Sequence, residues 1–207
     1  VVAVNINLEY VKLKSSDGSI YYFAKDNLEY QRLEKQFAEK KQWIDGVPKL
    51  KTIAQIFKEH GGYEVLGSVK GSDLIGLEYI GPYDDLDAQN TAGGYPYVNE
   101  TLEKNGITSV MQHKVIDPGK DKIGNDIVVS GEGTGIVHMA PGCGDVDHKV
   151  GKEKGLINIA PLDEEARFMD DFGWLKDKSA TDPETIDLII EDLKKRQFLV
   201  YVEEYPH

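Results

Sequence analysis

The segment over residues 131–148 holds the side chains best suited to chemistry. We expect a buried strand over 134–139, followed by a turn over 140–144 that proline and glycine favour. We expect Asp145 to be the N-cap of a helix that ends before Gly155. A strand end, a tight turn and a helix start would then open to the same side.

An imidazole and a carboxylate lie on either side of this turn. His138 would leave the end of the strand, and Asp147 would lie in the first helical turn. There the positive end of the helix dipole favours the ionised carboxylate. The two side chains could then face one pocket. The structural alternative is that Asp147 is only a helix-start acid and His138 a core histidine with satisfied hydrogen bonds.

Three other chemistries draw on the same segment. A dinucleotide-binding loop needs a helix directly after its glycines, whereas the glycines over 131–135 run into β-branched residues. Cys143 could be a nucleophile, but the sequence places no base beside it, and a small loop residue explains it equally well. A zinc site has ligands of the right types but lacks the paired spacing that such sites show, so we expect no metal. Those ligands would be His138, Cys143, Asp147 and His148.

Composition and charge limit the classes of function. The chain has 207 residues, of which 40% are hydrophobic and 29% charged, so it can bury a core. Its net charge of −12 argues against a protein that grips nucleic acid through phosphate contacts alone. The single cysteine cannot form an internal disulfide, and no apolar run approaches the roughly 18 residues of a membrane span. We therefore expect a cytoplasmic protein that does not contact membranes.

Strands and helices follow each other in separate runs. Asp17 and Gly18 separate two β-rich stretches over 9–14 and 19–24, which predicts a hairpin. Helix formers then predict helices over 26–44 and 50–60, a helical insertion at about 25–60. Further strands are expected over 63–69, 74–79, 108–116, 127–129 and 198–202.

A helix is also expected near the end of the chain. Asp182 is a suitable N-cap and Pro183 a suitable first residue, and basic residues follow at 194–196. Apolar residues recur on one face at Ile186, Ile189, Ile190 and Leu193. Together the elements predict an α+β fold in a single domain over 1–207. Because the chain starts in a strand-like run without methionine, we expect a domain excised from a longer protein.

An ordered series of short motifs runs through the central segment. It comprises Gly133-Thr134-Gly135, His138, Ala140-Pro141, the loop Gly142 to Gly144, and Asp147. This series resembles the editing domain inserted in the class I isoleucyl-, valyl- and leucyl-tRNA synthetases. A histidine at 138, where valyl enzymes usually carry lysine, favours the isoleucyl branch. The resemblance covers nearly the whole chain and also includes Gly71 to Tyr79, Lys154 to Leu156, the late helix and Tyr205-Pro206-His207.

The resemblance implies a fold and a set of site residues. The fold would be a β-barrel-like core of short strands decorated by inserted helices. Asp147 would bind the α-ammonium of an aminoacyl group, and His138 would line its side-chain pocket and orient the ester or the water. The domain would need no cofactor, whereas the parent enzyme would use ATP and Mg²⁺ through motifs that do not occur here. Further substrate-binding positions would be Thr134, Gly135, Met139, Gly142 and Gly144.

The implied activity is removal of a wrong amino acid from tRNA. A pocket built for isoleucine rejects valine by only about 1 to 3 kcal/mol, and this pair is the standard example. The domain would therefore hydrolyse the ester of valyl-tRNA(Ile), with the tRNA 3′ end and the rest of the synthetase as partners. The family's threonine-rich strip is expected just upstream of Val1, so this stretch alone would lack one wall of the pocket. The alternatives are a valyl-enzyme editing domain, a non-catalytic tRNA-positioning module and a zinc-dependent hydrolase.

Overall fold

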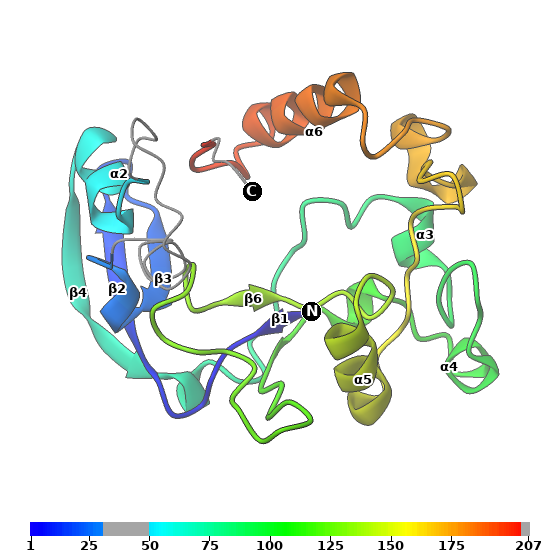
Figure 1. Cartoon of the computed structure of the whole chain (residues 1–207), viewed down its shortest axis with the longest axis horizontal. Helices are drawn as coiled ribbons and strands as arrows, with labels where there is room; N and C mark the ends of the chain where they lie inside the picture. The colour runs from blue at the N-terminus through cyan, green and yellow to red at the C-terminus, as the bar shows by residue number, and fades with distance from the viewer. Residues whose placement is uncertain (31–49, 204–207) are drawn as a thin grey trace. The chain divides into compact units, whose positions relative to one another are not determined.

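The computed structural model describes residues 1–30 and 50–203, and the chain divides into two compact units (Figure 1). The sheet unit contains Val2–Leu77, Val115–His138 and the chain from Tyr201. The helical unit contains Val1, Glu78–Lys114 and Met139–Val200. Most of the helix expected over 26–44 and the motif at 205–207 lie outside the described residues.

A three-stranded antiparallel sheet in the order β3-β2-β4 forms one part of the sheet unit. The expected hairpin is confirmed, because Gly18 takes the left-handed conformation (φ +88°) and the Asp17 carboxylate accepts a hydrogen bond from the Ser19 amide at 2.9 Å. The next expected strand, over 63–69, is also confirmed. The strands are β2 (Glu9–Ser15), β3 (Ile20–Ala24) and β4 (Tyr63–Lys70).

Helix α2 (Ile53–Glu59) packs on this sheet and confirms, in shorter form, the helix expected over 50–60. Thr52 and Gln55 cap its start reciprocally: each side chain accepts a hydrogen bond from the other's backbone amide. Ile53 and Phe57 are buried against Leu13 of β2. This apolar contact fixes the helix to the sheet.

The second sheet is small and has the order β5-β1-β6. The central strand β1 (Val2–Ala3) runs parallel to β5 (Val115–Ile116) and antiparallel to β6 (Val137–His138). Over residues 1–30 and 50–203, the two sheets are open and no closed barrel forms. The β-barrel-like core is therefore not seen, because strands of two residues offer too few pairings to close a sheet.

The helical unit consists of short helices around an apolar core. Leu86, Ala88, Phe172 and Leu175 are buried there together. The combination of these helices with two small sheets agrees with the expected α+β class. The helices are α3 (Asp87–Asn90), α4 (Glu100–Lys104), η3 (Val110–Gln112), α5 (Asp145–Lys154), η4 (Asp170–Leu175) and α6 (Pro183–Lys195). The sheet unit adds the single turns η1 (Lys25–Asn27) and η2 (Gly71–Asp73).

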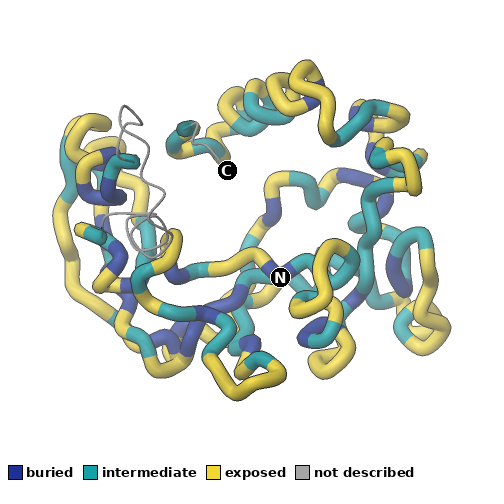
Figure 2. Tube along the Cα trace, viewed as in Figure 1, coloured by how far each residue is buried: buried dark blue, intermediate teal, exposed yellow. Residues whose placement is uncertain are grey.

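Helix α6 confirms the helix expected after Asp182. The Asp182 carboxylate accepts a hydrogen bond from the Glu184 amide at 3.0 Å, and Pro183 is the first helical residue. Most of the helix is exposed or half-buried (Figure 2), although Ile189 packs against the core of the helical unit. In the described part of the chain, no helix has the length and apolar character that crossing a membrane requires.

Four expected strands outside the central segment are wrong or much shorter. Gly76 adopts φ +83° in the stretch 74–79, so the chain turns there, and only Glu78 forms an isolated bridge. The stretch 108–116 starts with the helical turn η3 and ends in the two residues of β5. No strand forms over 127–129 or 198–202. β-branched residues alone are weak evidence for a strand when no partner strand is identified.

The strand expected over 134–139 is limited to the two residues of β6, and both are exposed. Gly133 and Gly135 have positive φ angles of +51° and +71°, which extended strands do not use. The Thr134 hydroxyl accepts a hydrogen bond from the Ile136 amide, two residues further on, at 3.2 Å. The sequence therefore turns before it extends.

Candidate functional site

Helix α5 begins directly after the glycine loop over 142–144. Gly144, with extended backbone (φ −170°, ψ 151°), is the N-cap, and Asp145 is the first helical residue rather than the expected N-cap. Asp147 lies in the first turn as expected, where unpaired backbone amides favour a negative charge. The helix ends as expected at Gly155, whose left-handed conformation (φ +65°) terminates it.

The first turns of α5 hold the start of the loop. The Asp147 Oδ2 atom accepts a hydrogen bond from the Ala140 amide at 2.9 Å, and the Cys143 amide donates to the Ala140 carbonyl at 2.8 Å. The His148 Nδ1 atom lies 3.2 Å from the Pro141 carbonyl oxygen. Because a carbonyl can only accept, this contact requires a proton on Nδ1. Asp147 and His148 thus anchor the Ala-Pro pair that opens the loop.

Two glycines allow this loop to approach its neighbours closely. A Cβ added at Gly142 would collide with the Ile159 carbonyl oxygen, and one at Gly151 would lie 2.6 Å from the Pro141 Cβ. Gly144 differs, since the nearest atom to an added Cβ would be 3.8 Å away, an ordinary contact distance. Packing therefore explains Gly142 and Gly151 without a ligand.

Two candidate substrate-binding residues of the sheet unit are used structurally. The Thr134 hydroxyl donates to the Ile136 carbonyl at 2.9 Å. Gly135 is buried, a Cβ there would collide with Ala24, and its carbonyl accepts a hydrogen bond from the Tyr10 hydroxyl at 2.8 Å. These contacts fix the turn that leads into β6.

The two candidate catalytic residues fall in different units. His138 belongs to β6 of the sheet unit, where it pairs with Val2 and is exposed. Asp147 belongs to the helical unit and is half-buried. The candidate positions Met139, Gly142 and Gly144 also belong to the helical unit, and Met139 is only 1% exposed. Joint action of His138 and Asp147 stays a prediction.

The structure supports neither Cys143 as a nucleophile nor the alternative of a zinc site. Burial, and secondarily the negative charge of Asp147, raise the pKa of the Cys143 thiol, which disfavours the nucleophilic thiolate. Over residues 1–30 and 50–203, no group of three or more His, Cys, Asp or Glu side chains is arranged to hold a metal ion.

Asn27 is a residue that sequence reasoning missed. It is fully buried at the end of η1. Its Oδ1 atom accepts a hydrogen bond from the Gly131 amide at 2.7 Å, while its Nδ2 atom donates to the carbonyls of Glu132 (2.8 Å) and Gly133 (3.2 Å). It thereby fixes the loop that precedes Thr134. A lone asparagine far away in sequence carries no signal for this role.

A second missed cluster lies in the helical unit. His113 Nδ1 lies 3.0 Å from Asp84 Oδ1, and the Tyr79 ring stacks on the imidazole with centroids 5.0 Å apart. The imidazole and carboxylate meet at ion-pair distance without hydrogen-bond geometry, and both are largely buried. Burial, and secondarily the charge of Asp84, raise the pKa of Tyr79 to about 12. The cluster ties the chain at 79–84 to the end of η3.

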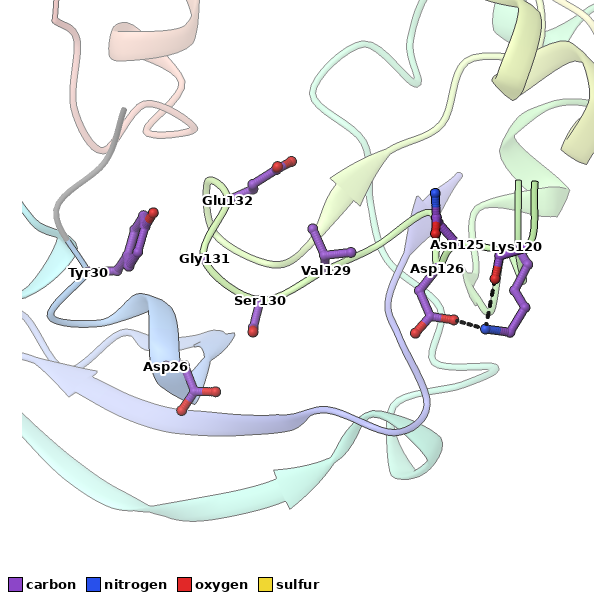
Figure 3. A pocket seen from close by; sticks show the side chains of 10 residues that line it. Asp26, Tyr30, Lys120, Asn125, Asp126, Val129, Ser130, Gly131 and Glu132 are labelled. Atoms are coloured by element: carbon purple, nitrogen blue, oxygen red, sulfur yellow. Dashed lines mark hydrogen bonds and ion pairs between the residues drawn. The ribbon is translucent and has the colours of Figure 1, made fainter. Parts of the chain in front are cut away.

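An open cavity of about 770 Å³ lies in the sheet unit, and none of the candidate site residues lines it (Figure 3). Three acidic side chains and Tyr30 line it, together with Lys120, which is paired with Asp126 at 2.9 Å. The acidic residues are Asp26, Asp126 and Glu132.

Comparison with known proteins identifies isoleucine–tRNA ligases as relatives of this chain. The chain is 34% identical over 76% of its length to isoleucine–tRNA ligase of Sulfurihydrogenibium sp. (strain YO3AOP1). It is 27% identical over its whole length to isoleucine–tRNA ligase 2 of Bacillus anthracis, and 29% identical over its whole length to isoleucine–tRNA ligase of Prochlorococcus marinus (strain MIT 9515). The chain belongs to the isoleucyl-tRNA synthetase family. This confirms the resemblance and its isoleucyl branch.

The relationship concerns one part of a synthetase. The chain covers 14% of the Sulfurihydrogenibium and Bacillus relatives and 16% of the Prochlorococcus relative. It therefore spans about a seventh of the length of the curated relatives it matches. No family model matches the chain.

Proposed function

We propose that this chain is the editing domain of an isoleucyl-tRNA synthetase and hydrolyses the ester that joins valine to tRNA(Ile). The observation that carries the proposal is the placement of Asp147. In a chain related to isoleucine–tRNA ligases, its carboxylate lies in the first turn of α5, beside the loop over 140–144.

Asp147 would bind the α-ammonium group of the valyl ester. A carboxylate accepts a charge-assisted hydrogen bond from an ammonium group more strongly than a neutral oxygen does. The first turn of a helix is a favourable place for a negatively charged group. Its role is therefore to position the substrate and not to attack it.

His138 would line the pocket for the side chain and orient the ester or the attacking water. The water oxygen adds to the ester carbonyl, and the bond to the ribose oxygen then breaks, which releases valine and the free tRNA hydroxyl. An imidazole can accept the proton of that water at neutral pH. Isoleucine would be excluded because its extra methylene does not fit.

The remaining candidate residues would contribute through backbone and shape. Because the Cys143 amide already donates to the Ala140 carbonyl, the amides of Gly142 and Gly144 are the candidates for contacts with the ribose or the carbonyl. The Thr134 hydroxyl would have to give up its bond to Ile136 before it could contact a substrate. Gly135 and Met139 would shape the pocket from buried positions.

We place this reaction in the cytoplasm, with the tRNA 3′ end and the rest of the synthetase as partners. ATP and Mg²⁺ would act in aminoacylation by the rest of the parent enzyme. The hydrolysis itself would need only the residues of the editing pocket and water.

The test uses a synthetase that contains this chain. Asp147→Ala should lower the rate of valyl-tRNA(Ile) deacylation about 100-fold, because an ionic hydrogen bond to the substrate is lost. Isoleucine activation, measured by pyrophosphate exchange, should be unchanged. Asp145→Ala is the matched control, since it removes a negative charge from the same turn of α5.

Wild-type deacylation by the Asp147→Ala enzyme would rule out the proposed role of Asp147. Absence of deacylation by the wild-type enzyme would favour the non-catalytic positioning module instead.

A further inference from the structure

We propose that Asp147 has a second task besides substrate recognition: through Oδ2 it is the latch that positions the loop over 140–144. The assignment of the other oxygen, Oδ1, to the substrate ammonium rests on the proposed function, whereas the latch itself does not. The two tasks use different atoms of one carboxylate and can therefore be separated by experiment.

The latch is a defined contact. Asp147 Oδ2 accepts a hydrogen bond from the Ala140 amide at 2.9 Å, in a partly buried setting and across seven residues of chain. An ionised carboxylate has two acceptor oxygens with about four lone-pair sites. One amide occupies only part of that capacity. The Val1 ammonium acts electrostatically on the same carboxylate.

Ala140 is the point at which the loop is tied at both of its polar backbone atoms. Its carbonyl accepts from the Cys143 amide at 2.8 Å, which closes the turn, and its amide donates to Asp147. The loop's internal bond sets its curvature. The bond to Asp147 sets its place relative to helix α5.

The other contacts between the loop and helix α5 engage Pro141 and not Ala140. Pro141 packs against Gly151, and the His148 ring contacts the Pro141 carbonyl. Neither contact engages the Ala140 amide. If Asp147 is truncated, that half-buried donor loses its partner, and the loop start is expected to open toward water.

The N-cap residue next to the half-buried Asp147 carboxylate is a glycine. Gly144 has no side chain, is exposed, and would place a Cβ no closer than 3.8 Å to Asp147 Cγ. If Oδ1 binds a small cationic group, Oδ2 can keep its bond to Ala140, because the two oxygens are separate acceptors. The latch would thus hold the binding oxygen in a fixed orientation.

The experiment compares substitutions of Asp147 in the ¹⁵N-labelled chain by amide hydrogen exchange. Asp147→Ala should accelerate exchange of the Ala140 amide at least tenfold. Asp147→Asn can still offer a carbonyl oxygen, so exchange should stay within about threefold of wild type. Asp145→Asn is the control, because it changes the charge by the same amount and should leave the exchange rate of the Ala140 amide unchanged. The exchange rate of the Val150 amide within α5 shows whether the helix persists in each variant.

A second measurement does not require truncation of the Asp147 side chain to alanine. In the wild-type chain, the Ala140 amide proton shift should follow the protonation of one carboxyl group as pH falls, because a neutral acid is a weaker acceptor. In Asp147→Asn this titration should disappear. Unchanged Ala140 exchange in Asp147→Ala, or a titration that survives in Asp147→Asn, would overturn the latch.

Substrate recognition is read separately, with a non-hydrolysable valyl-amino-adenosine as the probe. Loss of probe binding in Asp147→Asn with Ala140 still protected supports both tasks. Equal probe binding by wild type and Asp147→Asn, with the exchange results as predicted, would keep the latch and contradict the ammonium role. Failure of the proposed function and failure of the latch thus give different results.

Discussion

At the scale of single residues, the charge of Asp147 acts on the nearby Cys143 thiol, in addition to its proposed role in binding the substrate. It lies in the same turn region as the exposed thiol of Cys143, and its charge adds to burial in raising the pKa of that thiol. A raised pKa means a smaller thiolate fraction at neutral pH, so Cys143 should alkylate slowly despite its exposure.

This coupling gives a prediction on Cys143 reactivity. Asp147→Asn should increase the rate of iodoacetamide labelling at pH 7.5 by about two- to fivefold, because the thiolate is no longer opposed by a nearby negative charge. Labelling is followed by mass spectrometry. Asp145→Asn should produce a smaller change, since Asp145 does not contribute to the raised pKa. Equal rates in wild type and Asp147→Asn would show that the carboxylate does not influence Cys143.

At the residue scale, the sequence predicted where Asp147 lies in its helix but not which groups it contacts. Asp147 was expected in the first turn of a helix because Pro141 and the following glycines stop the preceding segment, and it lies there. Its bond to Ala140 could not be predicted, because the side chain folds back over a loop whose path depends on packing. The same holds for Asn27, whose three hydrogen bonds reach a loop more than a hundred residues away.

At the scale of elements, α5 is an unusual helix because it carries a glycine at its centre. Gly151 is buried and lies against Pro141, where an added Cβ would be 2.6 Å from the ring. Helix propensity favours alanine over glycine by about 1 kcal/mol, whereas a clash with a rigid ring in a packed site costs about 1 to 3 kcal/mol. We therefore expect the steric clash to outweigh the gain in helix propensity.

We therefore predict that Gly151→Ala lowers the free energy of unfolding of the chain by up to about 2 kcal/mol, despite the better helix propensity of alanine. The shift of the urea midpoint measures it. Lys152→Ala, an exposed position in the same helix, should be close to neutral. A stabilised Gly151→Ala variant would mean that Pro141 does not pack on α5 as described.

The elements that the sequence predicted well are those with local signals. Helix α6 has Asp182 and Pro183 at its start, and the β2-β3 hairpin has Asp17 and Gly18 in its turn. The two-residue strands β1, β5 and β6 depend on partners distant in sequence, such as Val2 with Val115. Periodicity cannot identify pairings of this kind, which is why five expected strands were wrong or shortened.

At the scale of the whole molecule, the net charge of −12 bears on how a tRNA substrate would be held. Phosphate contacts need Lys and Arg, and an acidic chain repels a polyanion at long range. Most of the affinity for tRNA should therefore come from other parts of the synthetase. The chain itself should recognise the aminoacyl end, where its candidate site offers a carboxylate to an ammonium group.

The central claim is that this chain selects valine from isoleucine on the terminal adenosine. The most direct measurement is an NMR titration of the ¹⁵N-labelled chain with non-hydrolysable valyl-amino-adenosine and, in parallel, with its isoleucyl counterpart. NMR detects binding in the millimolar range. We predict that the valyl compound shifts the signals of His138 and Asp147, and that the isoleucyl compound does not. Equal shifts with both compounds, or shifts confined to residues remote from these two, would contradict the account.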